Sequence, residues 1–353
     1  MNLTACRVTE RTIEHGFQAV TLENEQLLVT ILPEKGADIY QLVYKPRNMD
    51  VLWKSPWGLK RPGGGMPTAA NSEEVWLEHY EGGWQEIFPN GGDACRYKGG
   101  NLNFHGEVST LPWEYTVERA GERVSIEFRV STYRSPFILR RLISIEAGHP
   151  VLRISEQITN RGEEEMHFMW GHHPAFGGPF LEGDCTIQLP GGVYQAHSSE
   201  ISPLSRISPG TVAKWPAIPG KQGIVDLSRV PPMTERHCEF GYLRDLSDGW
   251  YALTSRKHDF SFGLVWPLEV FPYLWFWQEL RGSFGFPWYG GCYVMAVEPF
   301  TSIPGTGLEN AIQAGTAPVI APGASINLEM AALFIPGQEK INRLTLDGIV
   351  TAE

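Results

Sequence analysis

The sequence predicts an all-β protein, a large antiparallel β-sandwich that carries long functional loops. Three observations predict this fold class. Apolar and polar residues alternate with a period of two in many segments, turn-forming residues separate those segments, and no amphipathic helix of more than two or three turns is evident. The 38 Gly and 26 Pro leave little room for long helices. Short strands without helices between them are typical of sandwiches and barrels rather than of α/β sheets.

The clearest strand patterns lie at residues 124–130, 138–145 and 326–334, where every second side chain is apolar over most of the segment. Each segment is expected to form a half-buried strand. Residues 147–150, 160–162 and 321–324 are rich in Gly, Pro, Asn and Ala, and they suit the reversals of an antiparallel sheet.

Two stretches lack this alternation. Residues 60–103 are rich in Gly, Trp and Asn, and they are expected to form long loops carried by the sheet, with a functional role indicated by their aromatic content. Residues 190–232 form a second loop-like stretch. The chain shows no internal repeat and no dividing linker, so residues 1–353 are expected to form a single domain.

Composition and charge narrow the possible partners. The formal net charge of -11 argues against nucleic acid, whose binding requires clustered Lys and Arg, and it suits a neutral small molecule. The first residues lack a signal-peptide pattern and no window approaches eighteen apolar residues, so a cytoplasmic protein without a membrane segment is expected. The five scattered cysteines suggest neither a disulfide framework nor a zinc site. The sequence carries no signal of oligomeric state.

Three short segments contain residues suited to proton transfer. Residues 101–107 include His105, residues 169–177 include His172 and His173, and residues 293–304 are an apolar run that contains Glu298 followed by a proline. A carboxylate at the end of an apolar strand, directly before Pro, needs a partner or a function because burial of a charge is costly. We therefore expect Glu298 at the mouth of a strand.

The order of these segments resembles the galactose mutarotase or aldose 1-epimerase superfamily, in its broader aldose-epimerase-like branch. The matching features are a Phe-Pro-Asn element at residues 88–90, the His105–Gly106 pair, and a late Glu298 before a proline-containing loop. A His-x-Tyr-Phe element of the family is matched at residues 173–176, although the Tyr of that element and an Asn that follows it are absent here. Each motif alone is weak, but together they cover nearly the whole chain in a fixed order.

The resemblance implies a β-supersandwich with a sugar cleft on one sheet face, and an enzyme that interconverts the α and β anomers of a free aldose without metal or cofactor. In family terms His173 is the acid at the ring oxygen, Glu298 is the base at the anomeric hydroxyl, and His105 holds the ring oxygen. With pKa values near the reference values of about 6.5 for His and about 4.3 for Glu, this pair is suited to neutral pH.

Substrate contacts are expected from seven further residues. Trp277 and Trp84 are candidates to pack against the apolar faces of a sugar, and Asn90 and Gln278 to bond its hydroxyls. Well-studied members of the family have Arg where this chain has Gly91, and Asp93 or Arg96 are possible replacements. His172 either supports the site or points to the opposite sheet face, as adjacent strand residues do. The full set of candidates is Asn90, Asp93, Arg96, His172, Trp277, Gln278 and Trp84.

Two other functions remain open at this stage. A metal-dependent isomerase of the cupin kind would draw on the imidazoles and the carboxylate, although these groups are far apart in sequence. A non-catalytic sugar-binding or sensing protein would keep the cleft and lose the chemistry. A phosphorylated sugar is disfavoured, because no Arg or Lys cluster accompanies the motifs.

Overall fold

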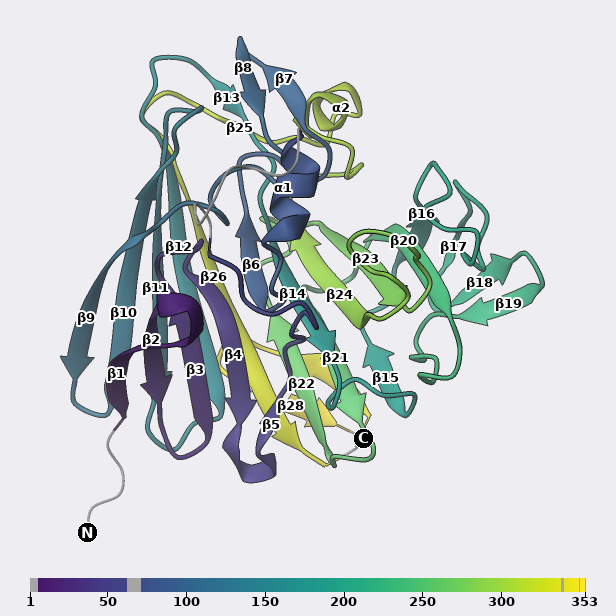
Figure 1. The fold of residues 1–353 in the computed structure, drawn as a ribbon, viewed down its shortest axis with the longest axis horizontal. Helices are drawn as coiled ribbons and strands as arrows, with labels where there is room; N and C mark the ends of the chain where they lie inside the picture. The colour runs from purple at the N-terminus through teal and green to yellow at the C-terminus, as the bar shows by residue number, and fades with distance from the viewer. Residues whose placement is uncertain (1–5, 62–70, 338–339, 349, 353) are drawn as a thin grey trace.

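Two antiparallel sheets make up most of the computed structural model, which describes residues 6–61, 71–337, 340–348 and 350–352 (Figure 1). Within these residues the larger sheet has twelve strands, and β5 (Met49–Asp50) pairs with β4 outside the main order. The main order is β1 (Arg7–Thr12), β2 (Gln18–Glu23), β3 (Leu27–Leu32), β4 (Asp38–Tyr44), β6 (Trp84–Ile87), β14 (Gly171–Gly177), β24 (Tyr293–Phe300), β23 (Tyr273–Leu280), β20 (His237–Arg244), β16 (Val193–Ala196) and β17 (Val212–Lys214).

The second sheet has eight strands in the described part of the chain. Their order is β15 (Cys185–Gln188), β21 (Trp250–Ser255), β22 (Phe260–Val265), β26 (Ser325–Pro336), β12 (Val151–Asn160), β11 (Phe137–Glu146), β10 (Arg123–Ser131) and β9 (Glu114–Ala120). The three strands expected from alternation are found as β10, β11 and β26. The predicted all-β antiparallel sandwich is therefore confirmed.

Smaller elements decorate the two sheets. Four short hairpins or strand pairs and four short helical segments are described. They are β7 (Cys95–Tyr97) with β8 (Gly100–Leu102), β13 (Met166–His167) with β25 (Val319–Ile320), β18 (Ala217–Gly220) with β19 (Gly223–Asp226), β27 (Ile341–Leu344) with β28 (Val350–Ala352), α1 (Ser72–Glu78), α2 (Leu308–Gln313), and the 3₁₀ turns η1 (Glu14–Gly16) and η2 (Lys45–Arg47).

The expectation of long loops at 60–103 and 190–232 was only partly right. The first stretch contains α1, β6, β7 and β8 between its loops, and the second contains β16 to β19. These elements are three to seven residues long. Segments of that length are too short to establish a hydrophobic period. Residues 62–70 of the first stretch lie outside the described residues.

The main core lies between the two sheets. A large cluster of buried apolar side chains draws on strands of both sheets, and the rings of Phe176 on β14 and Phe262 on β22 meet with centroids 5.0 Å apart. Burial of this apolar surface is the main force that holds the sheets together. The expectation that residues 1–353 form one domain stays a prediction. No helix in the described part of the chain has the length and apolar character needed to cross a membrane.

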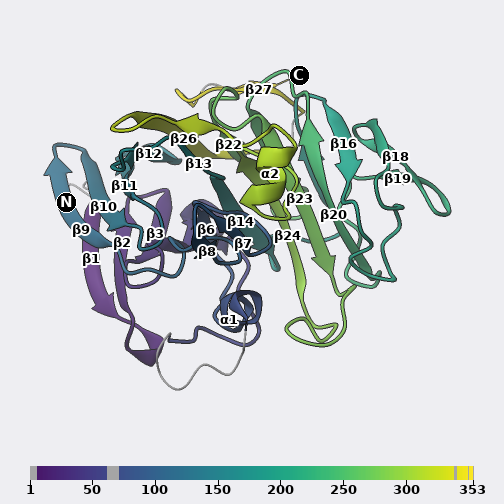
Figure 2. The same cartoon turned by 90° about the horizontal axis from the view of Figure 1, so that it is seen from above.

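The other face of the larger sheet carries a second, mostly aromatic cluster. It includes Trp275 on β23 and Trp76 on α1, which lies on the side of this sheet away from β12 and β26 (Figures 1 and 2). Because side chains alternate along a strand, Phe276 belongs to the intersheet core while Trp275 and Trp277 face the outer cluster. This outer face holds the candidate site.

Candidate functional site

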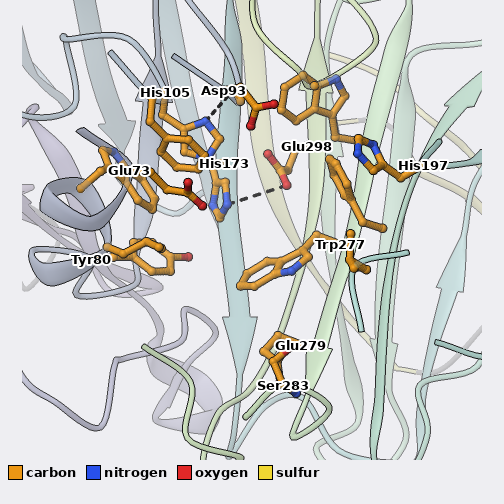
Figure 3. A pocket seen from close by; sticks show the side chains of 18 of the residues that line it. Glu73, Tyr80, Asp93, His105, His173, His197, Trp277, Glu279, Ser283 and Glu298 are labelled. Atoms are coloured by element: carbon orange, nitrogen blue, oxygen red, sulfur yellow. Dashed lines mark hydrogen bonds and ion pairs between the residues drawn. The ribbon is translucent and has the colours of Figure 1, made fainter. Parts of the chain in front are cut away.

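The centre of the outer face is a histidine and a carboxylate on neighbouring strands. β14 pairs with β24 so that Gly171 is opposite Phe300 and Ala175 opposite Ala296, and the same register places His173 opposite Glu298. Nε2 of His173 lies 3.8 Å from Oε1 of Glu298 (Figure 3). Two residues predicted from distant motifs are therefore direct cross-strand neighbours.

His105 reaches the same place from a loop after β8. Its backbone has φ of 54° and the next residue, Gly106, has φ of 74°. A Cβ at Gly106 would lie 2.2 Å from the carbonyl oxygen of Phe88, so this position requires glycine. The amide of Gly92 donates to Nδ1 of His105 at 3.1 Å. When the ring is neutral, its proton is therefore on Nε2, which remains able to donate to a ligand.

The three groups line one cleft of about 290 Å³. The rings of His105 and His173 have centroids 6.0 Å apart, and Trp277 lies 5.8 Å from His173 on the other side. The lining residues are Glu73, Trp76, Leu77, Tyr80, Gly92, Asp93, Phe104, His105, His173, His197, Ile201, Cys238, Phe240, Trp275, Trp277, Glu279, Ser283, Trp288, Glu298 and Gly305. Many aromatic walls with a few convergent polar groups are typical of small-molecule sites.

Burial changes the proton affinities of all three groups. It lowers the pKa of His173 to about 4, and it raises the pKa of Glu298 well above its ordinary value. Burial also lowers the pKa of His105 well below its usual range, with a further contribution from His173. The expectation of near-reference values for the pair was therefore wrong, because a site closed by aromatic rings disfavours every charged form.

These shifts act on the protons that the pair carries. With its pKa lowered to about 4, the imidazole of His173 takes up no proton at neutral pH, and the raised pKa of Glu298 favours the protonated carboxyl. In that form His173 and Glu298 together hold one proton. An ion pair of the same two residues would also hold one. Passing between these two forms moves one proton from the carboxyl to the imidazole, and across the 3.8 Å gap this needs a bridging hydroxyl group or a closer approach of the two side chains.

Several polar atoms in the cleft have no hydrogen-bond partner among the described residues. They include Nδ1 of His173, Oε2 of Glu298 and the hydroxyl of Tyr80, and all three residues are buried. An unpaired buried polar atom costs free energy that a ligand can recover. The cleft is therefore suited to a ligand with several hydroxyl groups.

Two of the seven predicted substrate contacts line the cleft, namely Asp93 and Trp277. Asn90 lies close by but does not line it. The side chain of Asn90 donates to the carbonyls of Asp93 and Asn103 and accepts from the amide of Leu308 at 2.6 Å. It therefore holds the surrounding loops together. Arg96 is exposed on β7 and is also outside the lining.

Three predicted contacts lie on the opposite face of the sheet. Nδ1 of His172 accepts from the indole of Trp84 at 3.1 Å, and its Nε2 lies 3.0 Å from Glu156 on β12. Gln278 accepts from Arg206 at 3.4 Å and is fully buried. The prediction that these residues contact the sugar was wrong. His172 and Gln278 are next to the cleft-lining residues His173 and Trp277 on their strands and so point the other way, and Trp84 packs in the intersheet core.

His172 is part of a buried ionic network between the sheets. Arg141 on β11 bonds Glu86 on β6 and lies 2.5 Å from Glu156, while the indole of Trp170 donates to Glu86 at 2.8 Å. Each charge therefore has a partner in the intersheet core, which is the condition under which buried charges are tolerated. The network lies on the face of β14 opposite to His173, around His172.

The position of the family arginine is closed in this chain. A Cβ at Gly91 would lie 2.8 Å from the ring of Phe300 and 3.0 Å from that of Trp275. These two rings stack on each other with centroids 3.8 Å apart. A larger side chain at this position would therefore require these rings to move.

Several lining residues were not predicted. Glu73, Trp76 and Tyr80 come from α1 and the residues after it, whose structure the sequence did not indicate. The alternation that places Trp277 in the cleft also places Glu279 there, and that signal was present in the sequence. His197 had no distinguishing signal, and it is held by the hydroxyl of Tyr242 at 2.7 Å.

Metal ligation is not indicated by the donor groups. In the part of the chain that the structure describes, no three His, Cys, Asp or Glu side chains are grouped so that they could hold a metal ion. The buried pair His173 and Glu298 can move protons without one.

Comparison with known proteins identifies a family and a fold. A family described as "Domain of unknown function (DUF4432)" matches residues 14–332. No curated protein matches the chain. A solved structure from Klebsiella pneumoniae, provisionally named an aldose 1-epimerase, is 14% identical with a TM-score of 0.70, over 94% of this chain and 84% of that one.

Two further structures are similar over nearly their whole length. A galactose mutarotase-like protein from Clostridium acetobutylicum is 13% identical with a TM-score of 0.64, over 94% of this chain and 99% of that one. A galactose 1-epimerase from Lactobacillus acidophilus is 11% identical with a TM-score of 0.59, over 95% and 99%. These likenesses show that the chain has the galactose mutarotase-like fold, as the sequence motifs predicted.

Proposed function

The chain belongs to the DUF4432 family, and from the geometry of its cleft we propose that this member is an aldose 1-epimerase. It interconverts the α and β anomers of a free aldose by opening and reclosing the sugar ring. The observation that carries the proposal is the pair of His173 and Glu298, 3.8 Å apart in an aromatic cleft with His105 beside them. The names of the structural relatives agree with this reaction.

Ring opening needs two proton movements. Glu298 accepts the proton of the anomeric hydroxyl, and His173 delivers a proton to the ring oxygen as the bond between that oxygen and C1 breaks. The product is the open-chain aldehyde. Rotation about C1–C2 and closure on the other carbonyl face reverse the two transfers and give the other anomer, so the enzyme returns to its starting state.

The single proton on the pair suits this cycle. Before ring opening the proton must pass from Glu298 to His173, and sugar hydroxyls bonded to Oε2 of Glu298 stabilise the resulting carboxylate. The Nε2–H of His105 donates to the ring oxygen and stabilises charge there, because its Nδ1 is engaged by Gly92. Trp277 provides an apolar surface for one face of the sugar.

We place the protein in the cytoplasm, where free aldoses of metabolism are found. All five cysteines are free thiols, and three of them, Cys185, Cys238 and Cys292, are buried. Thiols persist in a reducing compartment.

The test is anomer exchange followed by polarimetry or by NMR exchange spectroscopy. Purified protein is mixed with freshly dissolved single anomers from a panel of aldoses, and the rate is compared with that in buffer. Acceleration by the wild type and its loss in His173→Gln support the proposal. Binding of sugars without acceleration on any member of the panel would instead identify a sugar-binding protein that does not catalyse the exchange.

A further inference from the structure

We propose that the cleft selects aldoses that carry an ammonium group at the end of the molecule remote from the anomeric carbon, with Glu279 as the partner of that group. Phosphorylated and carboxylated sugars are excluded by the same feature. This inference rests on the proposed function, because it uses His173 and Glu298 to define where the anomeric carbon lies.

The first observation is the sign of the charges around the cleft. Besides the proton-holding Glu298, the lining has three carboxyl groups, from Glu73, Asp93 and Glu279, and it has no Lys or Arg. Every Lys and Arg of the sequence falls within the described ranges, so the absence of these residues from the lining holds for all of them. An anionic substituent would enter without a cation to pair with, whereas a cationic one would meet a carboxylate.

The second observation is an unsatisfied carboxyl oxygen at one end of the cleft. Glu279 is fully buried, and its Oε1 accepts from the amides of Gly282 at 2.8 Å and Ser283 at 3.0 Å. Its Oε2 has no hydrogen-bond partner among the described residues. Burial raises the pKa of this carboxyl, and the hydroxyl and amide of Ser283, the thiol of Cys238 and the amide of Gly282 only partly offset that effect. A cation in the cleft would satisfy the free oxygen.

The third observation is where Glu279 lies relative to the reacting groups. Trp275 is the register partner of Glu298, and Glu279 is four residues further along β23 on the same face. At about 3.3 Å per residue the two positions are separated by roughly 13 Å along the strand. Trp277 lies between Glu298 and Glu279 (Figure 3).

A sugar whose anomeric hydroxyl meets Glu298 therefore extends across Trp277 toward Glu279. The substituent that arrives there is the one farthest from C1, such as the group on C6 of a hexopyranose. An ammonium at that place forms a charge-assisted hydrogen bond with Oε2 of Glu279. A phosphate at the same place faces a carboxylate in a buried site, which is strongly unfavourable.

The test compares matched derivatives of the same parent sugar. Glucose and galactose are each supplied as the free sugar, the 6-amino-6-deoxy sugar and the 6-phosphate, and kcat/KM for anomer exchange is measured after subtraction of the buffer rate. For the parent that is turned over, we expect the amino derivative to exceed the free sugar about ten-fold and the phosphate to fall about 100-fold below it.

Glu279→Gln tests the assigned partner. The amide oxygen of Gln can still accept from Gly282 and Ser283, so the loop is retained while the charge is removed. The ratio of kcat/KM for the amino sugar to that for its parent should fall to about one. Glu74→Gln is the matched control. Glu74 is exposed and is next to the lining residue Glu73, so this substitution removes a charge outside the cleft. It should leave the ratio unchanged.

The inference and the proposed function fail in different ways. Equal turnover of the phosphate and the free sugar, or an unchanged ratio in Glu279→Gln, overturns the inference and leaves the epimerase standing. If no sugar is turned over, the inference is tested instead by the affinity of the wild type for each derivative, measured by calorimetric titration. Binding of the 6-amino sugar that is tighter than that of its parent, and lost in Glu279→Gln, supports the inference, and any other result overturns it.

Discussion

The Nε2 atom of His173 and the Oε1 atom of Glu298 lie 3.8 Å apart, which is too long for a hydrogen bond. Both residues are buried, and each has a further polar atom without a partner among the described residues. Two titratable groups that face each other without bonding are poised to act on a third molecule rather than to stabilise the fold.

Glu298→Gln is expected to abolish most of the activity. Gln keeps the shape of the side chain and cannot accept the proton of the anomeric hydroxyl, so the rate of anomer exchange should fall by about 10²- to 10⁴-fold. Polarimetry with the preferred aldose measures this change, and calorimetric titration should still detect the sugar. A variant that retains wild-type rates would rule out Glu298 as the base.

The same variant should be more stable than the wild type at neutral and alkaline pH. Burial raises the pKa of Glu298, so the folded state resists losing a proton that the unfolded chain gives up near about pH 4.3. Stability is therefore lost as pH rises toward the raised value, and a neutral Gln removes that loss. We expect a gain in the free energy of unfolding on the order of 1 kcal/mol near pH 8, measured by urea denaturation. No gain, or a loss that is independent of pH, would contradict this account.

The pH dependence of kcat/KM should be flat between about pH 5 and about pH 7. The active form carries one proton on His173 and Glu298, and the pKa of His173 is lowered to about 4 while that of Glu298 is raised, so this form dominates throughout the range. An ordinary His and Glu pair would lose its proton above about pH 6.5. A decline in kcat/KM that begins near that pH would show that burial does not shift the pKa values of the pair in solution.

Substitutions of the adjacent residues His172 and His173 should have different effects on activity and on stability. His173→Gln is expected to remove most of the exchange activity with a small change in stability. His172→Gln should lower the free energy of unfolding by about 2–4 kcal/mol, because it disturbs the partners of buried Glu156, while kcat changes by less than about ten-fold. Circular dichroism in urea and polarimetry on both variants test the pair. Equal losses of activity would mean that His172 acts in the site.

Trp277→Leu should weaken substrate binding more than it slows the chemistry. Loss of an aromatic face costs about 0.5–1.5 kcal/mol, so KM should rise by about two- to ten-fold with kcat nearly unchanged. Trp57→Leu is the control, since Trp57 is 44% exposed and lies outside the cleft lining. A fall in kcat with constant KM would assign Trp277 a different role.

Chelation should not reduce activity. His173 and Glu298 transfer the protons themselves, so dialysis against a chelator is expected to leave kcat/KM unchanged. Metal analysis of the active protein accompanies this assay. A stoichiometric metal whose removal abolishes exchange would favour the cupin-type alternative.

The sequence predicted those features that repeat over a long segment or form an ordered set. Strands β10 and β11 have nine and ten residues, enough for period-two alternation to be recognised. The motifs of His105, His173 and Glu298 pointed to groups that the fold brings together. The role of each group in catalysis stays a prediction.

The remaining features depend on register and on loop conformation, which local patterns do not encode. Whether His172 or His173 faces the cleft is set by the pairing of β14 with its neighbours. Asn90 beside a motif is equally suited to bond a sugar or to hold a loop, and only the positions of Asp93 and Leu308 distinguish these roles. The position of His197 in the cleft lining depends on its contact with the hydroxyl of Tyr242, which is distant in sequence.

The stacked rings of Trp275 and Phe300 against Gly91 also limit how this protein can evolve. Any side chain at position 91 would collide with both rings, so an arginine there requires simultaneous replacement of at least one of them. Those rings belong to the same strands as the cleft, and intermediates with only one change would be unstable. An arginine at this position is therefore several coupled substitutions away from this chain, and changes in what the cleft accepts are more accessible through exposed lining residues such as Asp93.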